Sequence, residues 1–139
     1  MRLCEEVITV VNQVRNGEDG FTDYRKTVIR GASWYGSLKA TVDSSGLKAA
    51  NQYIVRIPTD ADFDGKAYLN PISYWNAEDV SKLFTFANGD LIVHGEVTEA
   101  DNEITPKLIH DNYAEVLTIL TVNDNRKLRK EPHWKVVGA

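Results

Sequence analysis

The most informative stretch of the chain is Phe84-Thr85-Phe86-Ala87-Asn88-Gly89-Asp90-Leu91-Ile92-Val93-His94-Gly95-Glu96-Val97. Its central Asn-Gly pair is the dipeptide that best supplies the two positive-φ positions of a type I′ turn. After this turn, Leu91 and Val93 alternate with Ile92 and His94, which is the two-residue period of a β-strand. The stretch therefore predicts a strand, a tight turn and a second strand, joined as a hairpin.

Further segments with the composition of β-strands lie on both sides of this stretch. Turn signals such as Gly31 and Asp43-Ser44-Ser45-Gly46 separate them at spacings of roughly ten residues. The additional predicted strands are residues 6–13, 21–29, 33–42, 50–57, 66–69, 114–122 and 134–137. The pattern is typical of an antiparallel β-sandwich or β-barrel of roughly six to nine strands.

Helical patterns are short and few. Residues 76–84 predict one short helix, with Asn76 as its N-cap and Glu78 and Asp79 in the first turn, where the helix dipole favours acidic residues. Residues 105–110 predict a single helical turn with Pro106 at its first position. The predicted fold is mainly β, an antiparallel barrel or sandwich with one short helix, in a single β-rich domain over residues 1–139.

Size and composition are those of one ordinary globular domain. A chain of 139 residues buries about 68–70% of its unfolded surface, which is enough for a core without disulfides. The apolar runs are too short to cross a bilayer, and the start of the chain lacks the apolar segment of a secretory signal. We therefore expect an intracellular protein that does not associate with membranes.

Charge and cysteine content exclude several kinds of site. The net charge of −4 argues against specific nucleic-acid binding, because neutralising phosphates requires a basic face. The single cysteine, Cys4, excludes an intramolecular disulfide and a cysteine-rich zinc site. Cys4 itself remains open to two interpretations, a nucleophilic thiol or a packed residue near the terminus.

One acidic turn resembles the first half of a calcium loop. In Asp60-Ala61-Asp62-Phe63-Asp64-Gly65, oxygen ligands occupy alternate positions before the glycine that permits a sharp turn. The closing acid expected at the twelfth position is replaced by Pro71. Asp60, Asp62 and Asp64 are therefore candidate metal ligands, and the alternative is a solvated turn in which the aspartates bond their own backbone.

The residues near the C-terminus form the candidate partner-binding surface. Arg126, Lys127, Arg129 and Lys130 make a dense basic run in an acidic chain, either a solvated loop between two strands or a docking patch for an acidic partner. His133 and Trp134 follow directly, and they predict either an interface anchor or local packing.

Catalytic motifs are absent from the sequence. It contains no Walker A loop and no glycine-rich dinucleotide motif, and its three histidines are far apart. Ser44-Ser45-Gly46 lacks the strand-turn-helix context of a nucleophile elbow. A small hydrolase would need a paired acid and base, which no spacing indicates, so we predict that the protein is not an enzyme and has no cofactor.

Five segments spread over nearly the whole chain share a pattern with one class of proteins. They are Val7-Ile8-Thr9-Val10-Val11-Asn12, Thr27-Val28-Ile29-Arg30-Gly31-Ala32-Ser33-Trp34, Tyr53-Ile54-Val55-Arg56-Ile57-Pro58, residues 86–96 and residues 132–138. Taken together, they resemble the small head-tail connector and minor capsid proteins of tailed phages and prophages of Gram-positive bacteria. These motifs are structural, and they carry no functional residue across.

The resemblance implies a β-barrel head-closure protein, or stopper, that docks as a ring beneath the portal and its adaptor and retains packaged DNA until the tail joins. Its partners would be portal, adaptor and tail proteins, and its location the bacterial cytoplasm during assembly and then the virion. Alone, it is expected to be a monomer or weak oligomer. The alternative is a small acidic binding module, calcium-assisted through Asp60, Asp62 and Asp64.

Overall fold

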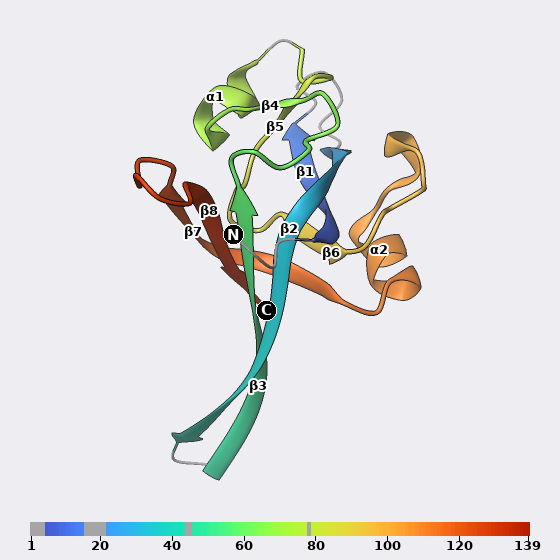
Figure 1. The fold of residues 1–139 in the computed structure, drawn as a ribbon. Helices are drawn as coiled ribbons and strands as arrows, with labels where there is room; N and C mark the ends of the chain where they lie inside the picture. The colour runs from blue at the N-terminus through green and yellow to red at the C-terminus, as the bar shows by residue number, and fades with distance from the viewer. Residues whose placement is uncertain (1–4, 16–21, 44–45, 78) are drawn as a thin grey trace.

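The computed structural model describes residues 5–15, 22–43, 46–77 and 79–139. Two short α-helices and one 3-10 helix interrupt eight strands (Figure 1). The strands are β1 (Glu6–Arg15), β2 (Thr22–Asp43), β3 (Gly46–Pro58), β4 (Ala67–Tyr68), β5 (Leu83–Phe84), β6 (Leu91–His94), β7 (Val116–Asn125) and β8 (His133–Gly138). The helices are α1 (Pro71–Asn76), the 3-10 helix η1 (Asp101–Glu103) and α2 (Pro106–Asn112).

Six of these strands close into an antiparallel barrel in the order β1-β2-β3-β8-β7-β6. β6 pairs with both β1 and β7 and so completes the circle of hydrogen bonds. The predicted mainly β fold is confirmed, and of the two predicted architectures it is the barrel.

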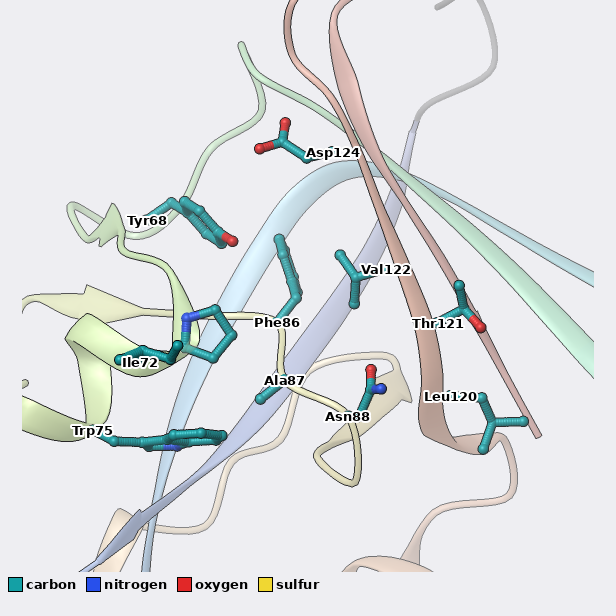
Figure 2. A pocket seen from close by; sticks show the side chains of 11 residues that line it. Tyr68, Ile72, Trp75, Phe86, Ala87, Asn88, Leu120, Thr121, Val122 and Asp124 are labelled. Carbon is teal, nitrogen blue, oxygen red and sulfur yellow. The ribbon is translucent and has the colours of Figure 1, made fainter.

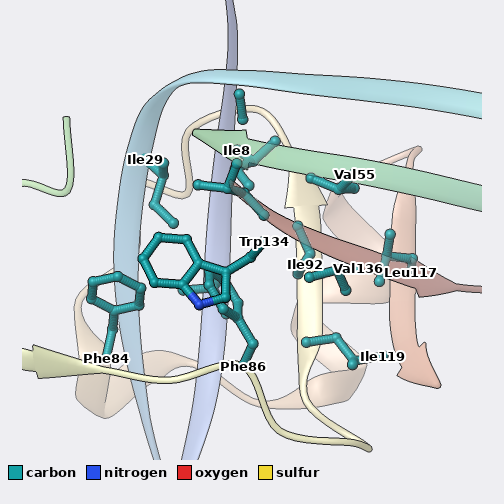
Figure 3. Packing of buried hydrophobic residues seen from close by; sticks show 13 residues of the cluster. Ile8, Ile29, Val55, Phe84, Phe86, Ile92, Leu117, Ile119, Trp134 and Val136 are labelled. Carbon is teal, nitrogen blue, oxygen red and sulfur yellow. The ribbon is translucent and has the colours of Figure 1, made fainter. Parts of the chain in front are cut away.

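The centre of β1 is apolar on both faces because each face has its own core. Ile8 and Val10 belong to the main cluster inside the barrel, which Figure 3 shows around Trp134. Val11 belongs to a second cluster outside the barrel, where it packs with residues of β6 and with Ile109 of α2. The α2 segment therefore covers the outside of the barrel wall at β1 and β6.

Gly31 bends a strand that was predicted to end there. β2 continues through it, and the register with β1 shifts where Gly31 adds one residue between Arg30 and Ala32. The φ of Gly31 is 97°, a left-handed conformation that glycine adopts without steric cost. The predicted strands 21–29 and 33–42 are thus one bulged strand that leaves β1 and continues with β3.

The predicted type I′ hairpin around Asn88 and Gly89 is wrong. Of these two residues, Gly89 alone has a positive φ, of 91°. Asp90 N donates to Ala87 O at 3.1 Å, and together these features are the pattern of a type II turn. β5 pairs in parallel with β4 rather than with β6. The reason is tertiary, because the Asn12 side chain of β1 hydrogen-bonds Thr85 and Asp90 and draws this segment onto β1.

The predicted helix over residues 76–84 is also wrong. Helix α1 ends at Asn76, and its N-cap is Asn70, whose Oδ1 accepts from Ser73 N at 3.0 Å, with Pro71 in the first turn. The predicted turn over residues 105–110 is confirmed as α2, where Thr105 Oγ1 accepts from Leu108 N at 3.1 Å. Among the residues that the structure describes, α2 is the one α-helix of seven residues, and α1 is shorter by one residue.

Part of the β2–β3 hairpin extends beyond the barrel. β1 pairs with β2 only as far as Ala32, and β8 pairs with β3 only from Tyr53 onwards. Residues 37–43 and 46–52 consequently pair only with each other, and we call them the β2–β3 arm. Seven residues of strand span roughly 23 Å. In Figure 1 the arm projects from the end of the barrel opposite α1.

Candidate functional site

An apolar groove lies between helix α1, the segment that follows β5, and strand β7. Its volume is about 740 Å³. Figure 2 shows α1 residues on one side, β7 residues on the other and Phe86 and Ala87 between them. The groove is lined by Tyr68, Pro71, Ile72, Trp75, Phe86, Ala87, Asn88, Leu120, Thr121, Val122 and Asp124.

Three of the groove residues are large apolar side chains that face solvent. Ile72 is 69% exposed, Trp75 45% and Leu120 55%. Among the residues whose side-chain burial the structure describes, Tyr35 and Leu128 are comparably exposed. An exposed apolar cluster of this kind commonly marks an interaction site.

A β-bulge exposes Leu120. The β7–β8 register jumps from Ile119 to Thr121, so Leu120 is the extra residue that has no partner on β8. Bulges re-aim a side chain out of the regular alternation of a strand. Leu120 therefore lines the groove with more than half of its surface exposed.

Aromatic rings of the core support the groove from beneath. Tyr68 stacks on Phe86 with ring centroids 5.8 Å apart, and Trp134 lies 4.9 Å from Tyr68 and 5.6 Å from Phe86. Because Phe86 and Trp134 are buried, the floor of the groove is continuous with the barrel core. The floor of the groove is therefore part of the barrel core.

Arg126 is held beside the groove by the Asp124 carboxylate and by two aromatic rings. Its Nε and a terminal nitrogen donate to the two carboxylate oxygens of Asp124 at 2.8 and 2.6 Å. Its guanidinium lies 4.8 Å above the Tyr68 ring and 5.2 Å from the Trp134 ring. The hydrogen bonds from Arg126 hold the pKa of Asp124 below its usual range, so this pair is charged at neutral pH.

The structure divides the predicted partner-binding residues into two groups. Lys127, Arg129 and Lys130 are exposed on the turn between β7 and β8, as a docking loop requires. His133 and Trp134 are buried, with exposed fractions of 8% and 4%, because β8 directs Trp134 into the barrel core. Of the two alternatives that the sequence left open for this pair, the burial of both side chains agrees with local packing.

In the acidic turn of residues 60–65, an aspartate side chain accepts a hydrogen bond from the backbone of the turn itself. Asp62 Oδ1 accepts from Asp64 N at 3.0 Å, and the backbone of Asp62 pairs with that of Arg30. Throughout the ranges the structure describes, no three His, Cys, Asp or Glu side chains are grouped so as to hold a metal ion. Of Asp60, Asp62 and Asp64, it is Asp62 that stabilises the turn by a side-chain hydrogen bond to its backbone.

His94 is half-buried in its strand and joins three parts of the barrel. Its Nε2 is 2.7 Å from Glu6 Oε2 at the start of β1, its Nδ1 contacts the Glu115 carboxylate just before β7, and its ring stacks on Trp34. Burial lowers the pKa of His94, but hydrogen bonds to both carboxylates outweigh it and raise that pKa above its ordinary value. No local pattern in the sequence predicts this cluster, because its members are far apart along the chain.

Two further predictions fall partly or wholly outside the described residues. Cys4 lies there, as do Ser44 and Ser45 of the predicted turn. Among the helices that the structure does describe, none is long and apolar enough to span a membrane.

Comparison with known proteins gives one match. No curated protein and no solved structure matches the chain. A family model does match residues 3–139, nearly the full length, and its description is a family of unknown function, DUF6751. The chain therefore belongs to the DUF6751 family.

Proposed function

We propose that this protein is a structural component of a tailed phage or prophage particle, acting at the head-tail junction in head completion or as a minor capsid protein. The observation that carries the proposal is the exposed apolar groove on a rigid barrel, beside the basic turn of Lys127, Arg129 and Lys130. Both features are surfaces for holding other proteins. The sequence resemblance to connector proteins indicates a phage particle as the assembly in which the groove and the basic turn would act.

The charge of the chain is compatible with this role. A stopper surrounds a channel through which DNA passes, and its wall should not retain phosphates. The chain has a net charge of −4, so the barrel as a whole repels DNA. The basic turn is then available for an acidic surface of a portal, adaptor or tail protein.

The test is complementation of a phage that lacks the gene. Lys127→Glu with Lys130→Glu reverses two exposed charges of the turn, and we expect fewer DNA-filled, tailed particles than with the unaltered protein. The matched control, Lys82→Glu with Lys107→Glu, makes the same charge change at exposed positions elsewhere.

Two outcomes would count against the proposal at different levels. Normal particle yields from the Lys127 and Lys130 variant would remove the docking role from the turn. Deletion of the gene without any loss of filled, tailed particles would remove the proposed function itself.

A further inference from the structure

We infer that the groove binds an extended segment of a partner protein, which pairs as an added strand with the open edge of β7. Apolar side chains of this segment lie in the groove, and its acidic residues lie at the basic turn of Lys127, Arg129 and Lys130. The inference rests on the proposed function, since the segment would belong to another protein of the particle, and it specifies the chemistry of that partner.

The first feature behind this inference is a gap in the barrel wall beside β7. β6 pairs with β7 only over residues 116–118, and backbone bonds of 2.9 and 2.8 Å then join Ile119 to Gly89 and Asp90. Beyond Ile119, within the described part of the chain, no strand pairs with β7 on the side away from β8. The groove occupies this gap, with β7 on one side and residues 86–88 next to it (Figure 2).

The hydrogen-bond pattern of β7 directs backbone groups into the gap. Thr118 and Ala139 exchange two backbone hydrogen bonds, of 2.9 and 3.2 Å, so they form a hydrogen-bonded pair. Hydrogen-bonded and non-hydrogen-bonded pairs alternate along an antiparallel ladder. Counting along β8 from Ala139 makes Val122 and Asp124 members of non-hydrogen-bonded pairs, so their N–H and C=O groups point away from β8. Among the described residues no backbone group pairs with them, and such an edge is a template for another strand.

The second feature is the apolar lining of the groove next to this edge. α1 provides Ile72 and Trp75 on the side opposite β7, and Leu120 lies on the β7 side (Figure 2). Side chains of a strand point alternately to its two faces, so every second residue of an added strand can contact this lining. The groove volume of about 740 Å³ is within the usual range of ligand pockets, about 300–1,000 Å³, and suits a short segment.

The third feature is positive charge at one end of the groove. A hollow of about 370 Å³, lined by Asp124, Arg126 and Lys127, adjoins the groove at Asp124, which lines both. Residues 124–131 contain four basic and two acidic residues and so carry +2, while the rest of the chain carries −6. An acidic segment is therefore attracted to this end of the groove and repelled by the rest of the molecule.

Together, the edge and the charge predict the order of residues in the partner. Antiparallel pairing is slightly more stable per residue than parallel pairing, and β7 runs toward the basic turn. An antiparallel partner strand therefore begins at the basic turn and continues down the groove. Its sequence should have acidic residues first, followed by apolar residues at alternate positions.

The first test selects binders from a library of random 12-residue peptides displayed on yeast. We expect the enriched peptides to have acidic residues followed by alternating apolar residues. A selected peptide labelled with fluorescein then gives a dissociation constant by fluorescence anisotropy. Enrichment of basic peptides, or no enrichment over the starting library, would overturn the inference.

Leu120→Asp tests whether the selected peptide lies in the groove. Binding should weaken by about tenfold or more, because a charge replaces an apolar contact. Tyr35→Asp is the matched control, since Tyr35 is equally exposed and lies outside the groove. Circular dichroism checks the fold of both variants. Equal binding by the two variants would overturn the inference, as would self-association that Leu120→Asp abolishes, which would assign the groove to a second copy.

Lys127→Glu with Lys130→Glu tests the acidic end of the peptide. This variant should bind more weakly than the unaltered protein, and the difference should shrink at high salt, because exposed charges are screened. Lys82→Glu with Lys107→Glu, the same charge change elsewhere, should bind more strongly than the variant of the turn. Equal affinities of the two variants would reject the basic turn as the acidic-residue site.

N-methylated peptides test the strand pairing itself. Backbone nitrogens of an added strand point alternately toward β7 and away from it. Two versions of the selected peptide carry N-methyl groups on the two alternate sets of nitrogens. One version should bind at least about tenfold more weakly than the other, because it loses its hydrogen bonds to the edge. Equal affinities would show that the peptide does not bind as a strand.

The peptide site and the phage role can fail separately. Selective peptide binding, together with normal numbers of filled, tailed particles after deletion of the gene, would retain the site and reject the phage role. Loss of particles after the deletion, without any selected peptide, would reject the site and retain the role.

Discussion

Asn12 and Asp90 form a buried polar pair that connects β1 to the segment before β6. Asn12 Nδ2 donates to Asp90 Oδ2 at 2.9 Å and to Thr85 O at 2.7 Å, and both side chains are almost completely buried. Burial raises the pKa of Asp90 to about 6, although the hydrogen bonds from Asn12 and Gln13 favour its charged form. This pair connects the segment that forms the floor of the groove to β1. The connection requires the burial of a carboxylate.

Asp90→Asn should change how stability depends on pH. The ordinary pKa of Asp90 is 3.8 and its folded-state pKa is about 6, so the folded state binds the proton more tightly and stability falls as pH rises between these values. The difference corresponds to about 3 kcal/mol in the free energy of unfolding. Urea unfolding from pH 4 to pH 7 should show this loss for the unaltered protein relative to Asp90→Asn, and parallel pH profiles would contradict it.

His94→Gln should have an effect that depends on pH in the same direction. The folded-state pKa of His94 is raised, so the stabilisation by its charged form is complete below 6.5 and is lost as pH rises through the folded-state value. For a partly exposed pair, the effect should be about 1 kcal/mol or less. Thermal unfolding should show a larger deficit of His94→Gln at pH 5.5 than at pH 8.5. His110→Gln, at an exposed position on α2, is the control.

Arg126→Ala should destabilise the fold more than Lys130→Ala does. Arg126 makes two hydrogen bonds to Asp124 and lies over two aromatic rings, whereas Lys130 is an exposed residue of the turn. The expected cost is about 1 kcal/mol, mainly from the cation–π contacts and the charged hydrogen bonds. Equal melting temperatures for the two variants would show that the Arg126 contacts contribute no net stability. The basic run is thus one residue held by contacts, Arg126, followed by the exposed residues of the turn.

At the scale of elements, the start of each of the two α-helices depends on one polar side chain. Asn70→Ala removes the acceptor for Ser73 N in α1, and Thr105→Ala removes the acceptor for Leu108 N in α2. Each change should cost about 1 kcal/mol. Asn76→Ala is the control, since Asn76 ends α1 rather than capping a helix. If Asn76→Ala were as costly as Asn70→Ala in urea unfolding, the position of α1 would be wrong.

The barrel as a whole carries one exposed apolar groove, with the basic turn beside it. We expect the purified protein to be a monomer at low concentration, because permanent interfaces are larger and more hydrophobic than a single groove of this kind. Sedimentation velocity should therefore give the mass of a single chain, 15.6 kDa. A stable large ring in the purified protein would contradict assembly on a partner.

The sequence by itself determined the fold class and the positions of most strands. The two-residue alternation and β-branched composition of β1, β2, β3 and β7 are local properties, and they survive whichever strands pair. The start of α2 was predictable for the same reason, since Thr105 and Pro106 act on their own helix turn. The exposed basic turn was also visible as a run of charges between two strands.

Tertiary structure alone decided how the strands closed and where the groove formed. Asn-Gly at residues 88–89 predicted a hairpin, but hydrogen bonds from Asn12, more than seventy residues away, placed this segment on β1 instead. Leu120 faces the groove because the register of β7 and β8 leaves it without a partner on β8. Ile72 lines the same groove from α1, which is distant from β7 along the chain. Register, bulges and barrel closure depend on contacts between distant residues, which periodicity along the chain does not encode.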